Sequence, residues 1–149
     1  MGKEIVLTGI KPTGKVHAGN YIGAIKPALQ MAKARDCTAL YFIADYHGLT
    51  FIQNREEFHH LSYSIAATWL ALGLDPEKVI FYRQSDVPEI FELSWILSCM
   101  TPKGLMNRAH AYKAIVERNE QSGIDVDTGV NMGLYTYPIL MAADILLFQ

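Results

Sequence analysis

The chain of 149 residues is long enough to form a single compact domain with its own hydrophobic core. Half of its residues are hydrophobic and only 19% are charged, which excludes an intrinsically disordered protein. Because 13 basic residues stand against 15 acidic residues, no broad positive field indicates a polyanionic partner. Any contact with nucleic acid must therefore be local.

The sequence carries no sign of a membrane segment, a disulfide or a metal site. No apolar run approaches the roughly 20 residues of a membrane-spanning helix. The chain opens into an apolar strand rather than a signal peptide, so we expect a soluble, unprocessed protein without membrane contact. Cys37 and Cys99 are the only cysteines, and two thiols without close pairing predict neither a disulfide nor a zinc site. We therefore expect a cytoplasmic protein without metal ligands.

The first half alternates short apolar runs, typical of buried strands, with helical patterns. The predicted strands are Glu4–Thr8, which stops at Gly9, Thr38–Asp45, which a loop follows, and Lys78–Tyr82. Residues 18–35 have a helical pattern that Pro27 kinks or divides. A second helix, terminated by Gly73 and Pro76, has a core-facing stripe. The stripe consists of Leu61, Ile65, Trp69 and Leu72.

The second half is predominantly helical. Pro88 opens a helix with an apolar face that comprises Ile90, Leu93, Leu97 and Met100. Residues 117–128 are polar and predict a mobile surface loop. From Tyr137 to Phe148 an almost wholly apolar helix follows, with Pro138 at its first position. We expect this helix to be buried on nearly every side, with Asp144 as its single charge.

The alternation of strands and helices predicts an α/β fold with a Rossmann-like parallel sheet and helices on both faces. Ligands bind such sheets at the carboxyl ends of the strands. After the first strand, the loop Lys11–Gly14 leads to His17 and Asn20 at the mouth of a helix, where backbone N–H groups can hold phosphate. No Walker or GxGxxG motif is present. On loop chemistry alone, a structural turn explains this loop better.

A resemblance changes that balance. The segments Gly9–Gly14 and His17–Gly23 resemble the PTG loop and HIGH-type motif of tryptophanyl-tRNA synthetases, which are class I aminoacyl-tRNA synthetases. The resemblance implies that His17 and Asn20 hold ATP phosphates and stabilise charge at the α-phosphorus during adenylation. It also places Pro12, Thr13 and Gly19 at the ATP site.

Two positions depart from the pattern of many family members. Asn20 stands where histidine is common, and Lys11 stands where glutamine is frequent. Lys11 could add a cation near the ATP phosphates, or it could be a solvated surface lysine.

The segment Tyr137–Leu146 closely resembles the YPxLMAADIL segment of bacterial tryptophanyl enzymes. On a helix, Tyr137, Met141 and Asp144 project from one face. A carboxylate that accepts the indole N–H, beside a flexible thioether, forms a sensible tryptophan site. Alternatively, Asp144 forms a structural ion pair or cap, and Tyr137 and Met141 are core residues.

The same resemblance places further residues at the amino acid. Tyr137 would approach the substrate amino group, and Leu7 would lie where the first strand meets the pocket, a position that is often aromatic in relatives. His47 corresponds to a family position close to the amino acid, although a structural histidine explains it equally well. The adjacent His59 and His60 diverge on a helix, and we interpret both as surface residues.

Residues at about 83–130 resemble the family's connective insertion, and Lys103, Arg108 and Lys113 form their dense basic group. These charges could contact tRNA phosphates or a partner subunit, or could be merely solvated. The family's dimer interface lies in this region, so the resemblance implies a homodimer.

The resemblance covers residues 1–149 as the N-terminal part of a Rossmann-type catalytic domain. The GxDQ loop, the KMSKS loop and the anticodon-binding domain are absent, so we expect a fragment of a longer enzyme, and activity of the fragment alone is not implied. The implied full-length enzyme uses ATP with Mg²⁺ to activate tryptophan and transfers it to tRNA(Trp). The alternatives are a tyrosyl-tRNA synthetase and a non-catalytic tryptophan-binding fragment or paralogue.

Overall fold

The computed structural model describes residues 4–33 and 37–148. Their contacts form two compact units: the first ends at Val87, with Phe148 added to it, and the second is Pro88–Leu147. The second unit is separate because its helices pack mainly on one another. Composition alone favoured one compact unit. Among the described residues, no helix is long and apolar enough to span a bilayer.

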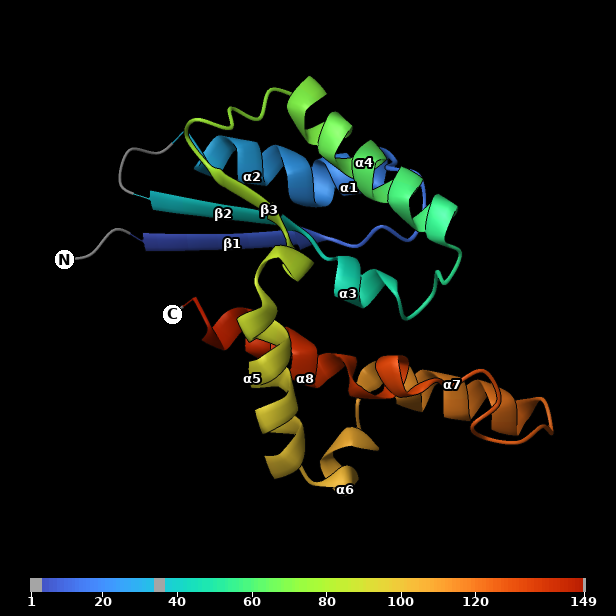
Figure 1. The fold of residues 1–149 in the computed structure, drawn as a ribbon. Helices are drawn as coiled ribbons and strands as arrows, with labels where there is room; N and C mark the ends of the chain where they lie inside the picture. Colours follow the sequence, from blue (N-terminus) through green and yellow to red (C-terminus); the bar gives the residue numbers. More distant parts are fainter. Residues whose placement is uncertain (1–3, 34–36, 149) are drawn as a thin grey trace. The chain divides into compact units, whose positions relative to one another are not determined.

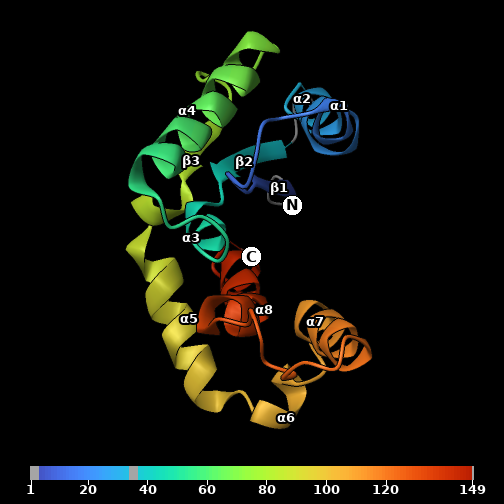
Figure 2. The ribbon, with the colours of Figure 1, turned by 90° about the vertical axis from the view of Figure 1, so that its right-hand side faces the viewer.

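The first unit is built on a three-stranded parallel sheet in the order β1-β2-β3, as the alternation predicted. The strands are β1 (Glu4–Ile10), β2 (Cys37–Ile43) and β3 (Ile80–Arg83). Because spatial order follows chain order, right-handed crossovers place both connecting helices on one face. Figures 1 and 2 show these helices, α2 and α4, on the same side of the sheet.

Strand β1 runs through Gly9 to Ile10, so the prediction that it stops at Gly9 was wrong. The glycine serves close approach instead. A Cβ on Gly9 would lie 2.5 Å from the Phe42 ring of β2. A strand glycine can indicate either a break or a close neighbour, and here it is the neighbour.

The helix predicted over residues 18–35 begins as expected but is divided. It comprises α1 (Ala18–Asn20), the π-helix η1 (Tyr21–Ile25) and α2 (Lys26–Met31). Pro27 has no N–H and cannot form the regular bond to the carbonyl four residues before it, so a π turn just upstream is a physically sensible accommodation. Residues 34–36 lie outside the described residues.

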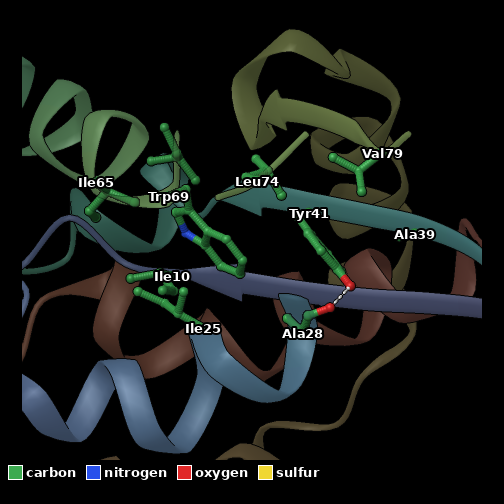
Figure 3. Close-up of a cluster of buried hydrophobic side chains, with 10 residues drawn as sticks. Ile10, Ile25, Ala28, Ala39, Tyr41, Ile65, Trp69, Leu74 and Val79 are labelled. Atoms are coloured by element: carbon green, nitrogen blue, oxygen red, sulfur yellow. Dashed lines mark hydrogen bonds between the residues drawn. The ribbon is translucent and has the colours of Figure 1, made fainter. Parts of the chain in front are cut away.

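The core packs α2 and α4 (Arg55–Ala71) against β2 (Figure 3). The Tyr41 hydroxyl donates to the Ala28 carbonyl, and the Tyr41 ring stacks on Trp69 with centroids 5.3 Å apart. Leu61, Ile65 and Trp69 are buried as predicted. Leu72 is exposed, because α4 ends at Ala71 and the chain turns through Gly73, which has φ +96°.

Short helices follow β2 and β3. Residues Asp45–Gly48 form α3 rather than a loop, and β2 ends at Ile43 rather than Asp45. After β3, which starts at Ile80 rather than Lys78, the 3-10 helix η2 covers Gln84–Asp86.

The second unit comprises helices α5 (Pro88–Met100), α6 (Lys103–Met106), α7 (His110–Gln121) and α8 (Met132–Leu146). Helices α5, α6 and α7 each contact α8. Ile90 is buried as predicted, but Met100 is 76% exposed. At 3.6 residues per turn, the ten residues between them fall about 80° short of three turns, so Met100 leaves the packed face.

Three further predictions in this unit were wrong. Residues 117–121 belong to α7 rather than to a loop, and the buried Asn119 amide donates to the Val126 and Thr128 carbonyls. Helix α8 begins at Met132, not Tyr137, because Asn131 caps it by accepting the Leu134 N–H at 2.8 Å. Pro138 therefore lies inside the helix. Its exposed residues, Met141, Ile145 and Leu146, also contradict burial on nearly every side.

Candidate functional site

A small cavity of about 150 Å³ lies between the loop after β1 and helix α4. It is lined by Ile10, Lys11, Thr13, Gly14, Lys15, Val16, His17, Asn20 and Ile65. The structure thus brings together four predicted ATP-site residues, Lys11, Thr13, His17 and Asn20. Small-molecule pockets typically measure roughly 300–1,000 Å³, so this cavity suits part of a nucleotide, such as its phosphates.

His17 and Asn20 cap the start of α1 reciprocally. The His17 Nδ1 accepts the Gly19 N–H at 3.1 Å, and the Asn20 Oδ1 accepts the His17 N–H at 3.1 Å. A ring nitrogen that accepts a hydrogen bond carries no proton, so the neutral His17 ring carries its proton on Nε2. Likewise, the anchored Oδ1 leaves Nδ2 as the donor end of the Asn20 amide. Each side chain therefore keeps one donor end outside the cap.

Pro12 and Gly19 do not line this cavity, but they support residues that do. Gly19 supplies the N–H of the cap, and Pro12 is fully buried. A Cβ on Gly48 would lie 2.8 Å from Pro12 Cγ and 2.9 Å from Phe58 Cε2. The glycine of α3 thus lets Pro12 pack closely, and this packing fixes the loop that carries Lys11 and Thr13.

The Lys11 side chain has a definite partner. Its Nζ lies 5.3 Å from the centroid of the Phe51 ring, within the range of a cation–π contact. Neither Phe51 nor the cavity-lining Lys15 was predicted. Lys15 could have been found, because it lies between two predicted residues of the same loop. Phe51 could not, because it is distant in sequence.

His47 is held at the carboxyl edge of the sheet by buried polar groups. The Asp45 carboxylate accepts the N–H groups of Tyr46 at 3.0 Å and Ser85 at 2.9 Å, and also the Ser85 hydroxyl. The Gln84 Oε1 accepts the His47 N–H at 3.4 Å. These bonds join α3 to η2, so the His47 backbone has a structural role whatever its ring does.

The predicted amino-acid residues fall in both units. Leu7 is half-buried on β1, where it pairs with Leu40, and belongs with His47 to the first unit. Tyr137, Met141 and Asp144 belong to α8 in the second unit.

Within the second unit, Asp144 is buried, Tyr137 is half-buried and Met141 is 47% exposed. Tyr137 lines a hollow of about 420 Å³ whose lining includes neither Met141 nor Asp144. The other lining residues are Leu97, Thr101, Leu105, Met106, Arg108, Ala109, His110, Pro138, Ile139 and Ala142.

Lys103 and Lys113, two of the basic residues predicted to contact tRNA or a partner subunit, have polar partners at the surface. The Lys103 ammonium donates to Asn107 Oδ1 at 3.2 Å, and Lys113 lies 3.5 Å from Glu117. Such exposed pairs contribute little stability. His59 and His60 are exposed on α4, as predicted, beside a shallow hollow of about 500 Å³. In residues 4–33 and 37–148, no three metal-ligating side chains cluster.

This phosphate-sized cavity follows the carboxyl end of a parallel strand and lies at the capped start of a helix. Such an arrangement is typical of nucleotide-binding α/β domains. The family model for class I tRNA synthetases (W and Y) matches residues 2–149, and the chain belongs to this family. The resemblance seen in the sequence is thereby confirmed.

The relatives are specific about the amino acid. The chain is 58% identical over 150 residues to the tryptophan–tRNA ligase of Neisseria meningitidis, covering all of this chain and 45% of that protein. It is 57% identical over 144 residues to the Pseudomonas aeruginosa tryptophan–tRNA ligase, covering 97% of this chain and 32% of that protein. The chain therefore spans less than half the length of these relatives.

Solved structures agree with this fold. The chain matches the tryptophanyl-tRNA synthetase of Campylobacter jejuni complexed with ADP and tryptophan with a TM-score of 0.81 and 46% identity. This match covers 97% of the chain and 42% of that structure. The tyrosyl-tRNA synthetase of Archaeoglobus fulgidus matches with a TM-score of 0.71 at 18% identity, over 97% of this chain and 43% of that structure. At this identity the match shows a shared fold alone.

Proposed function

We propose that this chain supplies the phosphate-binding and tryptophan-binding parts of a tryptophan–tRNA ligase. The full-length enzyme would activate tryptophan with ATP and transfer it to tRNA(Trp). The observation that carries the proposal is the cavity in which the reciprocally capped His17 and Asn20 meet Lys11 and Thr13. The high identity to tryptophan–tRNA ligases supports tryptophan as the amino acid.

In this proposal, the His17 Nε2–H and the Asn20 Nδ2 group donate to ATP phosphate oxygens. The tryptophan carboxylate attacks the α-phosphorus, the bond to the bridging oxygen breaks, and pyrophosphate leaves. Because the substrate supplies the nucleophile, the protein has to align the reactants and stabilise the developing negative charge. Donors that are already fixed by the cap need little reorganisation as that charge develops.

Mg²⁺ would enter with the nucleotide. It usually binds through substrate phosphates, one or two carboxylates and several waters. The described residues that line the cavity include no carboxylate, and their donors suit phosphate oxygens rather than a cation. Mg²⁺ would therefore sit on the phosphates, where it offsets their charge.

For tryptophan recognition, we propose that Asp144 accepts the indole N–H, with Met141 and Tyr137 on the same helix. We also assign Leu7 and His47 to the amino-acid site. Asp144 is buried on α8 and is the only charged residue of that helix. Tyrosyl-tRNA synthetase remains the alternative within the family, although the similarity to the tyrosyl enzyme is a fold-level one.

The proposal includes a homodimer, contact with tRNA(Trp) and a cytoplasmic location. Helix α5 presents the exposed apolar side chains of Phe91 and Trp95 about one turn apart, and an exposed apolar surface of this kind favours a protein partner. We interpret residues of about 83–130 as the connective insertion of the catalytic domain. The unit boundary after Val87 supports its start.

The test is tryptophan-dependent pyrophosphate exchange by the full-length protein, with tyrosine as the comparison amino acid. We expect stimulation by tryptophan only, and stimulation by tyrosine instead would assign the other specificity. Asp144→Ala should abolish tryptophan activation, and Asp144→Asn, which keeps one oxygen acceptor, should retain part of it. If full-length protein shows no exchange, the function is wrong; if Asp144→Ala keeps its tryptophan KM, the role of Asp144 is wrong.

A further inference from the structure

Phe51 is an aromatic residue with an unusual setting. It lies between α3 and α4 and is 61% exposed, although most phenylalanines bury their rings. Its backbone position is nevertheless fixed, because the N–H groups of Phe51 and Ile52 both donate to the Gly48 carbonyl at 3.1 Å. A turn anchored on α3 therefore holds the ring at the surface.

The ring faces one cation. Lys11 Nζ lies 5.3 Å from the Phe51 centroid, and the remainder of the Lys11 side chain extends from the loop that lines the phosphate-sized cavity. Within residues 4–33 and 37–148, Lys11 makes no ion pair with a carboxylate. The ring is therefore the contact that restricts the ammonium of this flexible side chain.

We propose that Phe51 is a positioning residue, which holds the Lys11 ammonium at the phosphate cavity before ATP binds; this inference rests on the proposed function. A lysine side chain has substantial rotamer entropy, and ordering it during binding would weaken ATP affinity. Contact with the Phe51 ring orders part of the Lys11 side chain before ATP binds, so less entropy is lost on binding. Phe51 itself is not among the residues that line the cavity.

An aromatic ring suits this task better than a carboxylate. A carboxylate partner would order Lys11 but would also neutralise its charge and compete with phosphate. The ring attracts the cation through its quadrupole and supplies no competing negative charge. Lys11 therefore keeps its full charge and its three N–H donors for a phosphate oxygen.

The test measures ATP binding and exchange separately in the full-length protein. Isothermal titration with ATP and Mg²⁺ gives Kd for Phe51→Leu, Phe51→Trp, Lys11→Met and the double variant Phe51→Leu/Lys11→Met. An exposed cation–π contact predicts that Phe51→Leu weakens ATP binding about two- to five-fold, whereas Phe51→Trp retains wild-type affinity. In the Lys11→Met background, Phe51→Leu should have no effect. The KM for tryptophan should not change.

Three results would overturn this role for Phe51. The first is wild-type ATP affinity in Phe51→Leu, and the second is tighter binding, which would show that the ring holds Lys11 away from phosphate. The third is an equal loss of affinity from Phe51→Leu in the Lys11→Met background. The last result would indicate a general effect on the loop, which thermal unfolding of each variant would detect. If the wild type binds ATP but shows no tryptophan-dependent exchange, the proposed function fails and the Kd comparison still decides the role of Phe51.

Discussion

The packing of Gly48 against Pro12 predicts how the Lys11–Gly14 loop, called here the phosphate loop, responds to one added methyl group. In Gly48→Ala, the new Cβ would lie 2.8 Å from Pro12 Cγ and 3.0 Å from Pro12 Cδ. The Pro12 ring is fully buried and cannot rotate away as a flexible side chain could. The loop that carries Lys11 and Thr13 must shift instead, so a change on α3 should reach the cavity.

The size of this effect follows from two opposing terms. Overpacking a core costs about 1–3 kcal/mol. Replacing a helical glycine by alanine returns roughly 0.5–1 kcal/mol. We therefore expect Gly48→Ala to lower the free energy of unfolding by about 1–2 kcal/mol. Gly23→Ala is the matched control, because no atom lies within 4 Å of its new Cβ, and it should be neutral or stabilising.

Urea unfolding and ATP titration of both variants test this reasoning. Gly48→Ala should be the less stable variant and should bind ATP more weakly, whereas Gly23→Ala should match the wild type in affinity. If Gly48→Ala equals Gly23→Ala in stability and in ATP affinity, Pro12 packing does not fix the phosphate loop.

Two further substitutions separate charge from structure. Asn20→Asp keeps the oxygen that caps the His17 N–H but replaces a donor by a negative charge, so ATP affinity should fall while urea stability is retained; unchanged affinity would exclude Asn20 from the phosphate site. Hydrogen bonding by Arg83 lowers the pKa of Asp86 below its ordinary 3.8, so the ionised carboxylate contributes stability above that pH. Asp86→Asn should cost less than about 1 kcal/mol at neutral pH, since the pair is exposed. The deficit should shrink as pH falls below 3.8 and vanish below the folded pKa; a deficit constant with pH would contradict this origin.

Local patterns predicted the sheet well, because short runs rich in branched and aromatic residues favour strands. They failed where one residue type has two uses. Gly9 could end a strand or admit Phe42, and Pro138 could begin a helix or lie within one that Asn131 caps. Tertiary packing decides the use of Gly9, whereas the local Asn131 cap decides that of Pro138.

The candidate site divides in the same way. Lys11, Thr13, His17 and Asn20 were predicted through the family resemblance, because one short stretch of chain carries the motifs and the residues together. The supports of that loop come from α3 and the turn after it. Gly48 and Phe51 have no local pattern that points to a phosphate site, and their roles emerge only from distances to Pro12 and Lys11.

The π turn η1 determines which way the capped helix start faces. A π turn is equivalent to inserting one residue into an α-helix. Ile25 and Ala28 are fixed in the core, so the extra residue shifts the angular position of everything before it. Each residue of an α-helix turns the chain by about 100°. Deleting one residue from Tyr21–Ile25 would restore a regular α-helix but would rotate His17 and Asn20 away from the cavity. The π turn therefore sets the direction in which these two side chains point.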